Sequence, residues 1–525
     1  MLQRPAFRVA LTAAAVALSA ACGTTVPLSQ QAQVGSGGSG LGGGSTSGGT
    51  TGAAAPVGTS TTGELTVPGS TSGGGSSTGA VQPGTSGGTG GTTGAVLPGS
   101  TTGASAVPTT IPATGPGWDK TTVYIGALTV NDLHTVAGGL GINLDPGDLE
   151  ADANAVATYV NSRGGLFGRK VKMLFRDTKT AEVAADPVSV GLQACTDFTQ
   201  DRKVIAVYSP VTTLDTENMR ACFAKAHVPI FSAGSAMLDS KAIAPYAGSY
   251  YMSTMVAWDK LAPVLVSRLK AQGWFGGWDQ RLGQAKNGKA PKIGILTSTT
   301  PAGTRVASEI RGALAKAGYP GAFVYQWTDA SQGQNSSVQY FNGNGVDHVI
   351  VADLELTAFQ NSAQTQQYKP RYGISTYNDP YTNLESLSPK GANNGALGIG
   401  WAPAYDVSDQ NDPGITGKGE STCLALNKSY GQNFSGKRTA RLFALAACDS
   451  ILLSVEGAKA GGGLRSDAVY RGALQIAPAF STAVSFGNAA LTPSHLFVSS
   501  SARDLAYFTD CSCFKYTSKG ATAHF

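Results

Sequence analysis

Long apolar runs are missing from almost all of this 525-residue chain. Residues 9–21, near the N-terminus, run apolar or small with no charge, and a run of that length is too short to span a bilayer as a helix. Charge is also scarce: 14% of residues are charged, the net charge is +5, and no basic cluster is interleaved with aromatic residues. We therefore expect no membrane-spanning segment after Cys22 and no nucleic-acid partner.

Motifs of catalysis and metal binding are absent as well. The chain has no Gly-x-Ser-x-Gly elbow, no His-Glu-x-x-His and no phosphate-binding loop. The glycine run at 138–141 lacks the spacing of a dinucleotide fingerprint. No Cys-x-x-Cys occurs, and the five histidines are scattered along the chain. We expect a protein that is not an enzyme and that has no cofactor and no metal site.

The N-terminus has the pattern of an export signal. Arg4 and Arg8 precede the apolar segment, which ends in Ser19-Ala20-Ala21-Cys22. A cysteine after small residues resembles a bacterial lipobox, although Ser19 stands where leucine is usual. We predict a signal peptide at 1–21 and lipidation of Cys22, which would hold the protein on the extracytoplasmic face of the bacterial membrane. The alternative is an ordinary cleaved signal with a chance cysteine.

Residues 22–117 are predicted to form a disordered linker. The stretch is rich in Gly, Ser, Thr, Ala, Pro and Val, and Glu64 is its single charged residue. Without an apolar period it has no core to offset the chain entropy lost on folding. A flexible chain of this length has a root-mean-square reach of roughly 55 Å, which would take the protein into the cell wall or periplasm.

Six cysteines remain after Cys22, and an even number outside the cytoplasm favours disulfides. Their pairing is not fixed by the sequence, because six cysteines can pair in 15 ways. We favour the near-neighbour set Cys195–Cys222, Cys423–Cys448 and Cys511–Cys513. The last pair would close a very small ring.

The part of the chain from Trp118 onward is longer than a single hydrophobic core normally accommodates. Two lobes are therefore expected. Apolar periodicity predicts helices at 149–160, 188–198, 216–226 and 305–317. It predicts strands at 123–128, 171–175, 204–208, 229–232, 292–297, 322–326 and 348–352. Two runs of alternating strands and helices, separated near 253–259, indicate an α/β protein with two doubly wound parallel-sheet lobes. The cleft between the lobes is the expected ligand site.

A glycine-rich motif carries a family resemblance. Residues 155–171 contain a helix followed by Asn-x-x-Gly-Gly-hydrophobic-x-Gly-basic, and the strand that begins there ends in Asp177. This stretch resembles the type 1 periplasmic binding proteins, in particular the Leu/Ile/Val-binding family of ABC importers. Segments 204–213, 228–235 and 292–303 agree with that family in order and spacing. Cys195 and Cys222 fall where some members have a disulfide.

The resemblance implies a fold and a function. It places lobe 1 at 118–255 and 403–486, and lobe 2 at 256–402 and 487–525. It implies a monomeric solute-binding protein that closes on a small amino-acid-like, carboxylate or amide ligand and delivers it to ABC permease subunits. The alternative is a surface-tethered ligand sensor or cell-wall interaction module with the same fold and no transport role.

Three loops of lobe 1 are expected to line the cleft. They contain Thr129, then Thr212 and Thr213, and then Gly234, Ser235 and Ala236. By resemblance, Thr213, Gly234 and Ala236 would hold an amino acid's carboxylate, with Ser235 compensating for Ala236, which replaces a common Thr or Ser. Taken without the resemblance, all of these could be ordinary turn residues.

Lobe 2 departs from the family pattern. The acid that binds the ligand's ammonium should fall near Thr376, but no acid follows until Asp379. We expect Asp353 or Glu355 to take that role, unless the ligand has no ammonium. Tyr377 is a candidate aromatic wall, or else a core residue. Amides, urea-like molecules, short carboxylates and aromatic acids therefore remain open as ligands.

Overall fold

The computed structural model describes most of the chain after residue 110. The described residues are 111–139, 144–234, 236–288, 290–328, 330–352, 356–415 and 417–525. The predicted signal peptide, Cys22 and the linker up to residue 110 lie outside them. Pro112, expected in the linker, is tied to the folded part: its carbonyl accepts the Trp118 indole N–H at 3.0 Å and the Arg169 guanidinium at 3.1 Å. The fold therefore begins before Trp118.

The first sheet is wholly parallel, with strand order β2-β1-β3-β4-β5. Its strands are β1 (Thr122–Thr129), β2 (Lys170–Asp177), β3 (Val207–Ser209), β4 (Ile230–Ser232) and β5 (Tyr250–Met252). The helices that follow these strands are α2 (Leu133–Gly139), α3 (Leu149–Ser162), α4 (Thr180–Ala185), α5 (Pro187–Thr196), α6 (Glu217–Ala226) and α7 (Ser240–Ile243). The predicted helix α3 begins at an Asp148 cap and ends before Gly164 and Gly165, whose positive φ angles suit glycine.

The second sheet has the order β14-β13-β12-β11-β10-β8-β9. Its strands are β8 (Ile293–Ser298), β9 (Phe323–Trp327), β10 (His348–Val351), β11 (Arg371–Ser375), β12 (Leu397–Gly400), β13 (Ser501–Phe508) and β14 (Cys513–Tyr516), with β15 (Ala523–His524) paired to β13. The strands β8 to β12 are parallel, as expected. The strand β13 is antiparallel to β12 and to β14. A hairpin too short for a crossover joins β13 to β14, which requires that pair to be antiparallel.

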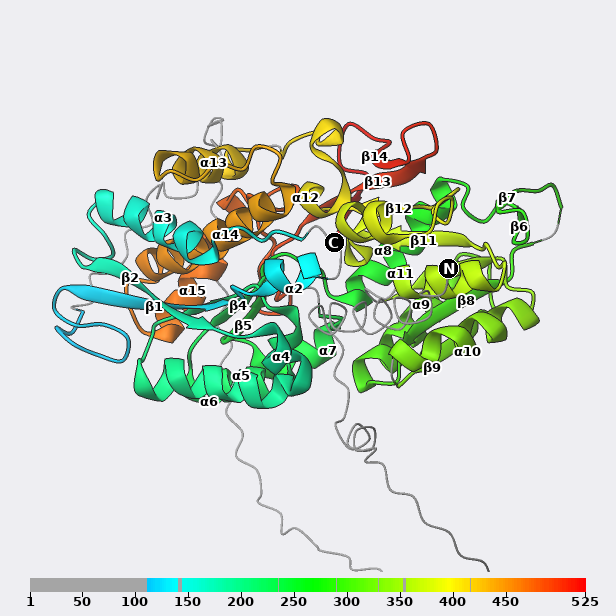
Figure 1. Ribbon diagram of the computed structural model, residues 1–525. Helices are drawn as coiled ribbons and strands as arrows, with labels where there is room; N and C mark the ends of the chain where they lie inside the picture. The colour runs from blue at the N-terminus through cyan, green and yellow to red at the C-terminus, as the bar shows by residue number, and fades with distance from the viewer. Residues whose placement is uncertain are drawn as a thin grey trace, which may run out of the picture. The chain divides into compact units, whose positions relative to one another are not determined.

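The chain passes between the two sheets three times. It leaves the first sheet after β5, returns after β12 and leaves again before β13. The remaining helices are α8 (Trp258–Ala271), α9 (Pro301–Lys316), α10 (Ala330–Gly343), α11 (Leu356–Thr365), α12 (Pro403–Asp406), α13 (Gly419–Ser429), α14 (Arg438–Ala460) and α15 (Ser466–Ile476). The late helix α14 (orange in Figure 1) lies against the early helix α3 (cyan), so the first lobe combines distant parts of the sequence.

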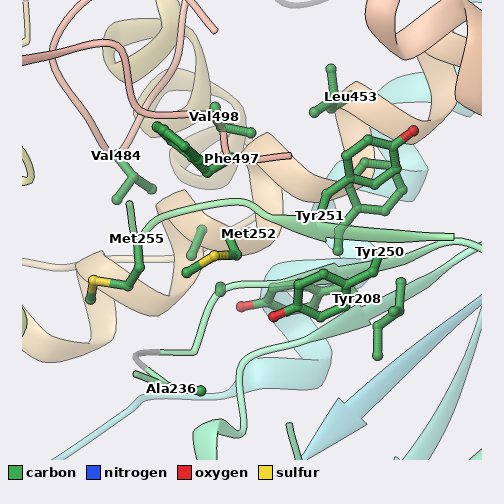
Figure 2. Packing of buried hydrophobic residues seen from close by; sticks show 14 of the residues in the cluster. Tyr208, Ala236, Tyr250, Tyr251, Met252, Met255, Leu453, Val484, Phe497 and Val498 are labelled. Carbon is green, nitrogen blue, oxygen red and sulfur yellow. The ribbon is translucent and has the colours of Figure 1, made fainter. Parts of the chain in front are cut away.

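Apolar side chains cover both faces of the second sheet. On β10, Ile350 belongs to one buried cluster, whereas Val349 and Val351 belong to another on the opposite face. The first cluster continues into the first lobe, where Met252 of β5 pairs with Phe497 from the last crossing (Figure 2). The two lobes therefore share a continuous apolar core along their connections.

Three disulfides link neighbouring elements, and their pairing is the near-neighbour set that the sequence analysis favours. They are Cys195–Cys222 between α5 and α6, Cys423–Cys448 between α13 and α14, and Cys511–Cys513 in the β13–β14 hairpin. Within the part of the chain that the structure describes, no helix is long and apolar enough to cross a membrane.

Candidate ligand-binding site

A cavity of about 90 Å³ lies between loops of the first lobe, the loop after β11 in the second lobe, and the start of α14. Since a buried water needs roughly 10–15 Å³ on this scale, the cavity has room for a ligand of several non-hydrogen atoms. Its lining residues are Val130, Leu133, Leu144, Leu149, Thr180, Val183, Pro210, Val211, Thr212, Thr213, Met255, Thr376, Asp379, Thr382, Tyr405, Thr439, Leu442 and Phe443.

The first-lobe hydroxyls sit on a short 3₁₀ turn, Thr212–Leu214, beyond the C-terminal end of β3. Parallel sheets bind ligands at this edge. The turn runs directly into Asp215, whose buried carboxylate accepts hydrogen bonds from Arg220 at 2.6 Å, from Ser232 Oγ at 2.8 Å and from the Tyr250 hydroxyl. These three partners fix the residue that follows the turn, and thereby the turn itself.

Gly234 lets a second loop approach this turn. A Cβ at Gly234 would lie 2.7 Å from the Thr212 Cα and 2.8 Å from its Oγ1. Both contacts are closer than van der Waals packing allows, and one of them is with backbone. Glycine is therefore required for the loop after β4 to pack behind Thr212.

The second lobe contributes a partly buried carboxyl, Asp379. It follows the turn Thr376–Asn378 with φ of 45°, and its Oδ1 accepts the Thr382 N–H at 3.4 Å. Burial raises the pKa of Asp379 to about 7; the Thr382 N–H opposes this rise and the nearby Asp406 adds to it. A positively charged ligand group would favour the ionised form of this carboxyl.

Asp406 fixes the position of the Thr376 side chain by hydrogen bonding. Its Oδ2 accepts the Thr376 hydroxyl at 3.0 Å, the Ala402 N–H at 3.1 Å and the Tyr516 hydroxyl. The Thr376 Oγ1 in turn accepts the Trp401 N–H at 3.0 Å. The Thr376 hydroxyl is thus fixed by the chain segment through which the second lobe connects back to the first.

The chemistry of the lining favours a small ligand with polar ends and an apolar body. Six threonines and Tyr405 offer hydroxyls, Asp379 offers a carboxyl, and most of the other lining residues are aliphatic. None of the described lining residues is Lys, Arg or His. A ligand carboxylate at this site would therefore be held by hydroxyls and main-chain N–H groups.

A profile described as periplasmic binding protein matches residues 133–495, well over half of the chain. The chain belongs to the periplasmic binding protein family. This match confirms the resemblance carried by residues 155–171. The family consists of solute-binding proteins that work outside the cytoplasm and are not enzymes. No curated protein matches the chain at a significant level.

Solved structures with this fold are described with different ligands. An ABC transporter substrate-binding protein from Desulfitobacterium hafniense, in complex with Leu, is 12% identical with a TM-score of 0.51, covering 75% of this chain and 99% of that one. A branched-chain amino acid ABC transporter from Thermus thermophilus with bound valine is 13% identical with a TM-score of 0.52, covering 77% and 96%. A fatty acid ABC transporter substrate-binding protein from Thermomonospora curvata is 12% identical with a TM-score of 0.52, covering 79% and 95%. At these identities the likeness shows the fold alone.

Three of the residues expected in the site of this periplasmic binding protein line the cavity: Thr212, Thr213 and Thr376. Thr129 does not line it; only 1% of Thr129 is exposed, and its hydroxyl donates to the Asp177 carboxylate at 3.5 Å. Its neighbour Val130 lines the cavity instead.

Of the six other residues expected in the site, three are described but do not line the cavity, and three lie outside the described residues. Gly234 and Ala236 are not among the lining residues, and Gly234 acts through its contact with Thr212. Tyr377 is fully buried at the lobe interface, where its hydroxyl donates to the Val256 carbonyl at 2.8 Å and its ring stacks on Trp258. Ser235, Asp353 and Glu355 lie outside the described residues.

Sequence reasoning missed most of the apolar lining and the carboxyl. Leu442 and Phe443 come from α14, more than 200 residues after Thr213. In the sequence they look like apolar residues of a helix that packs against the core. Asp379 had a usable signal, because it is the first acid after the strand β11 and its turn. Asp353 and Glu355, which the sequence makes the candidates for the ligand's ammonium, lie outside the described residues, so that expectation stays a prediction.

Proposed function

We propose that this protein is the extracytoplasmic solute-binding component of an ABC importer, and that it takes a small amino-acid-like ligand into the cavity between its lobes. The observation that carries this proposal is the arrangement of the lining. Hydroxyls of Thr212 and Thr213 stand on the first lobe, and the carboxyl of Asp379 stands on the second. The Leu and valine named with two similar structures support the same class of ligand.

In this proposal each lobe takes one end of the ligand. The hydroxyls of Thr212 and Thr213 donate hydrogen bonds to its carboxylate, and the Asp379 carboxylate accepts hydrogen bonds from its ammonium. Leu149 and Leu442 contact the apolar body. Because the ligand bridges the two lobes, it stabilises whichever lobe arrangement makes both contacts, and the closed form gains population in proportion to its higher affinity.

Contacts across the lobes give such closure a structural basis. Arg305 of α9 donates to the Asp239 carboxylate at the start of α7, with one N···O distance of 2.7 Å. The Trp401 indole N–H donates to the Thr254 carbonyl at 3.0 Å. Such contacts hold the lobes close enough for one ligand to reach both walls.

Binding is tested by thermal unfolding of the purified full-length chain with single L-amino acids, their amides and short carboxylates. A ligand at 100 times its Kd should add about 2.7 kcal/mol to the free energy of unfolding. A panel in which no compound raises the Tm would contradict the amino-acid-like ligand. The importer role is tested separately: cells lacking the protein should lose uptake of the radiolabelled ligand, and unchanged uptake would favour a sensor.

The remaining parts of the proposal rest on the sequence. The protein is a monomer, residues 1–21 are removed, and lipid on Cys22 anchors the chain to the membrane. Cys22→Ala should move the protein from the membrane fraction to the soluble fraction. A wild-type protein already found in the soluble fraction would refute the anchor without affecting the ligand proposal.

A further inference from the structure

The three disulfides of the described chain differ in what they join and in how far solvent reaches them. Cys195–Cys222 and Cys423–Cys448 each link two helices, and three of these four cysteines are fully buried. Cys511–Cys513 lies within a single turn, in the β13–β14 hairpin at the edge of the second sheet (red in Figure 1), and Cys511 is exposed. A thiol in solution can therefore reach the Cys511 side of this disulfide.

This disulfide adds little to the stability of the fold. In the chain-entropy account a disulfide stabilises by closing a loop, and the stabilisation grows with the length of that loop. The sequence separation is 2 residues for Cys511–Cys513, against 27 and 25 for the other two disulfides. The hairpin is also paired without the bond, from Leu505 opposite Tyr516 to Phe508 opposite Cys513. A purely structural role therefore does not account for this disulfide.

The turn that the disulfide closes has a backbone conformation that its sequence does not favour. Ser512, between the two cysteines, has φ of 53°, in the left-handed region where residues other than glycine are uncommon. Once the sulfur–sulfur bond is broken, Ser512 is free to leave this conformation, and this release favours the reduced form. Exposed or strained disulfides are the ones that exchange readily with thiols.

The buried sulfur of the pair is placed to leave as a thiolate. Asn411, in the turn Asp409–Asn411, donates from Nδ2 to Cys513 Sγ at 3.2 Å. An N–H that donates to a thiolate stabilises it, and a better stabilised thiolate leaves faster in exchange. After reduction the Cys511 thiol also has an acceptor, because its Sγ lies 3.7 Å from the Phe508 carbonyl oxygen. Both sulfurs of the reduced form thus have a partner.

We propose that Cys511–Cys513 is a thiol–disulfide exchange site that dithiols reduce while the other two disulfides stay intact, and that its reduction loosens the cavity loop that carries Asp379. One thiolate of the dithiol attacks Cys511 Sγ and forms a new sulfur–sulfur bond, while the Cys511–Cys513 bond breaks with its electron pair on Cys513 Sγ. The second thiolate of the dithiol then displaces Cys511. The dithiol is thereby oxidised to a disulfide, and each cysteine takes up one of the two protons that the dithiol loses. This site goes beyond solute binding and does not depend on the proposed function.

A hydrogen bond connects the hairpin with the cavity loop. The Phe514 N–H donates to Glu385 Oε1 at 2.6 Å. Glu385 ends the segment Pro380–Glu385, which follows Asp379 and contains the lining residue Thr382. Because Phe514 directly follows the disulfide, a change in the turn after reduction displaces its N–H from Glu385. The redox state of the hairpin is thus coupled to the second-lobe wall of the cavity.

Exchange is measured on the purified full-length chain with dithiothreitol as the dithiol. The protein is incubated at graded dithiothreitol concentrations, alkylated with iodoacetamide and mapped by peptide mass. Cys511 and Cys513 should become alkylated at roughly tenfold lower reductant than the cysteines of the other two pairs. Reduction of all three pairs at the same concentration, or of Cys511–Cys513 last, would overturn the exchange site.

The variant Asn411→Ala tests the leaving-group step. Without the Nδ2 donor, the rate of reduction by dithiothreitol should fall roughly threefold to tenfold, the effect of one hydrogen bond on the leaving thiolate. Asn433→Ala, which removes an exposed asparagine between α13 and α14, is the control and should keep the wild-type rate. An unchanged or faster rate in Asn411→Ala would overturn the assignment of Cys513 as the leaving sulfur.

Coupling to the cavity loop is measured by hydrogen exchange without any ligand. Main-chain amides of residues 381–385 should exchange faster in the dithiothreitol-treated wild type, and in Cys511→Ser/Cys513→Ser, than in the untreated protein. Amides of α5 and α6, whose disulfide stays intact, are the internal control. If the double variant is unfolded, the treated wild type decides the question. Unchanged exchange of residues 381–385 after reduction would overturn the coupling, whatever amino acids the protein binds.

Discussion

The two walls of the cavity are built in different ways. The first-lobe wall is shaped by packing: the Thr212–Leu214 turn is followed by the buried pair of Asp215 and Arg220 and lies against Gly234. The second-lobe wall is a single loop after β11, in which Thr376, Asp379 and Thr382 supply polar groups within seven residues. The first-lobe wall is thus a rigidly packed turn, whereas the second-lobe wall supplies an ionisable carboxyl.

The carboxyls of the two walls show what this difference means. Asp215 on the first-lobe side already has a cation, because Arg220 lies 2.6 Å away. On the second-lobe side Asp379 is partly buried and its neighbour Asp406 is fully buried, and burial raises the pKa of each to about 7. Breaking a buried ion pair is strongly destabilising, so the first wall is fixed before the ligand arrives. On the second wall, the ligand's ammonium would supply the cation for Asp379.

Removing the carboxyl of the second wall should have the largest effect. Asp379→Ala deletes the partner of a desolvated ammonium, which costs about 2–5 kcal/mol of binding free energy. Titration calorimetry with the best amino-acid ligand measures the change. Glu309→Ala, which removes an exposed acid from α9, should leave the Kd unchanged. If Asp379→Ala binds as tightly as the wild type, the ammonium is held elsewhere.

The same carboxyl predicts a pH dependence. Its pKa is about 7 without ligand, and an ammonium binds the ionised form, so below pH 7 the ligand must displace a proton. Affinity should fall by up to tenfold for each pH unit below 7, which amounts to about 50-fold, or roughly 2.3 kcal/mol, between pH 7 and pH 5. The Kd measured from pH 5 to pH 8 tests this. Asp379→Asn should flatten the curve, and a wild-type curve that is already flat would argue against an ammonium at Asp379.

On the first wall, Thr213→Val should have a smaller effect. The change keeps the shape of the side chain and removes its hydroxyl, so a buried ligand oxygen loses a donor at a cost of about 1–3 kcal/mol. Thr439→Val, on the α14 side of the cavity, is the comparison. If the two variants weaken binding equally, the Thr212–Thr213 turn is not the specific binding place of the ligand's carboxylate.

The sequence predicted the first wall better than the second for a physical reason. The strands β1 and β4 are short apolar runs and β2 begins with alternating lysines and apolar residues, so the predicted ranges match the ladders within a few residues. The strands β11 and β12 contain glycines that sheet packing demands: a Cβ at Gly398 would lie 1.8 Å from the Ile374 carbonyl oxygen. Glycine interrupts the apolar pattern, and we predicted neither strand.

The site shows the same division. Thr212 and Thr213 follow a strand that could be predicted, so their position at a sheet edge could be predicted too. Tyr405, Leu442 and Phe443 reach the cavity only because the chain returns to the first lobe after β12. Contacts across such sequence separations leave no periodic signal in a single chain.

Tyr377 gives the smallest and sharpest test, because sequence and structure assign it different roles. As an aromatic wall of the cavity it would contact the ligand, but the structure has its hydroxyl on the Val256 carbonyl, in the first connection between the lobes. Tyr377→Phe keeps the stacking on Trp258 and removes one buried hydrogen bond, so the free energy of unfolding should fall by about 0.5–1.5 kcal/mol. The Kd should change by less than threefold, because the cavity lining is untouched. Urea unfolding and titration calorimetry on the same preparation separate the two effects. A large loss of affinity with unchanged stability would move Tyr377 from the lobe interface into the ligand site, and the second wall would then contribute shape as well as charge.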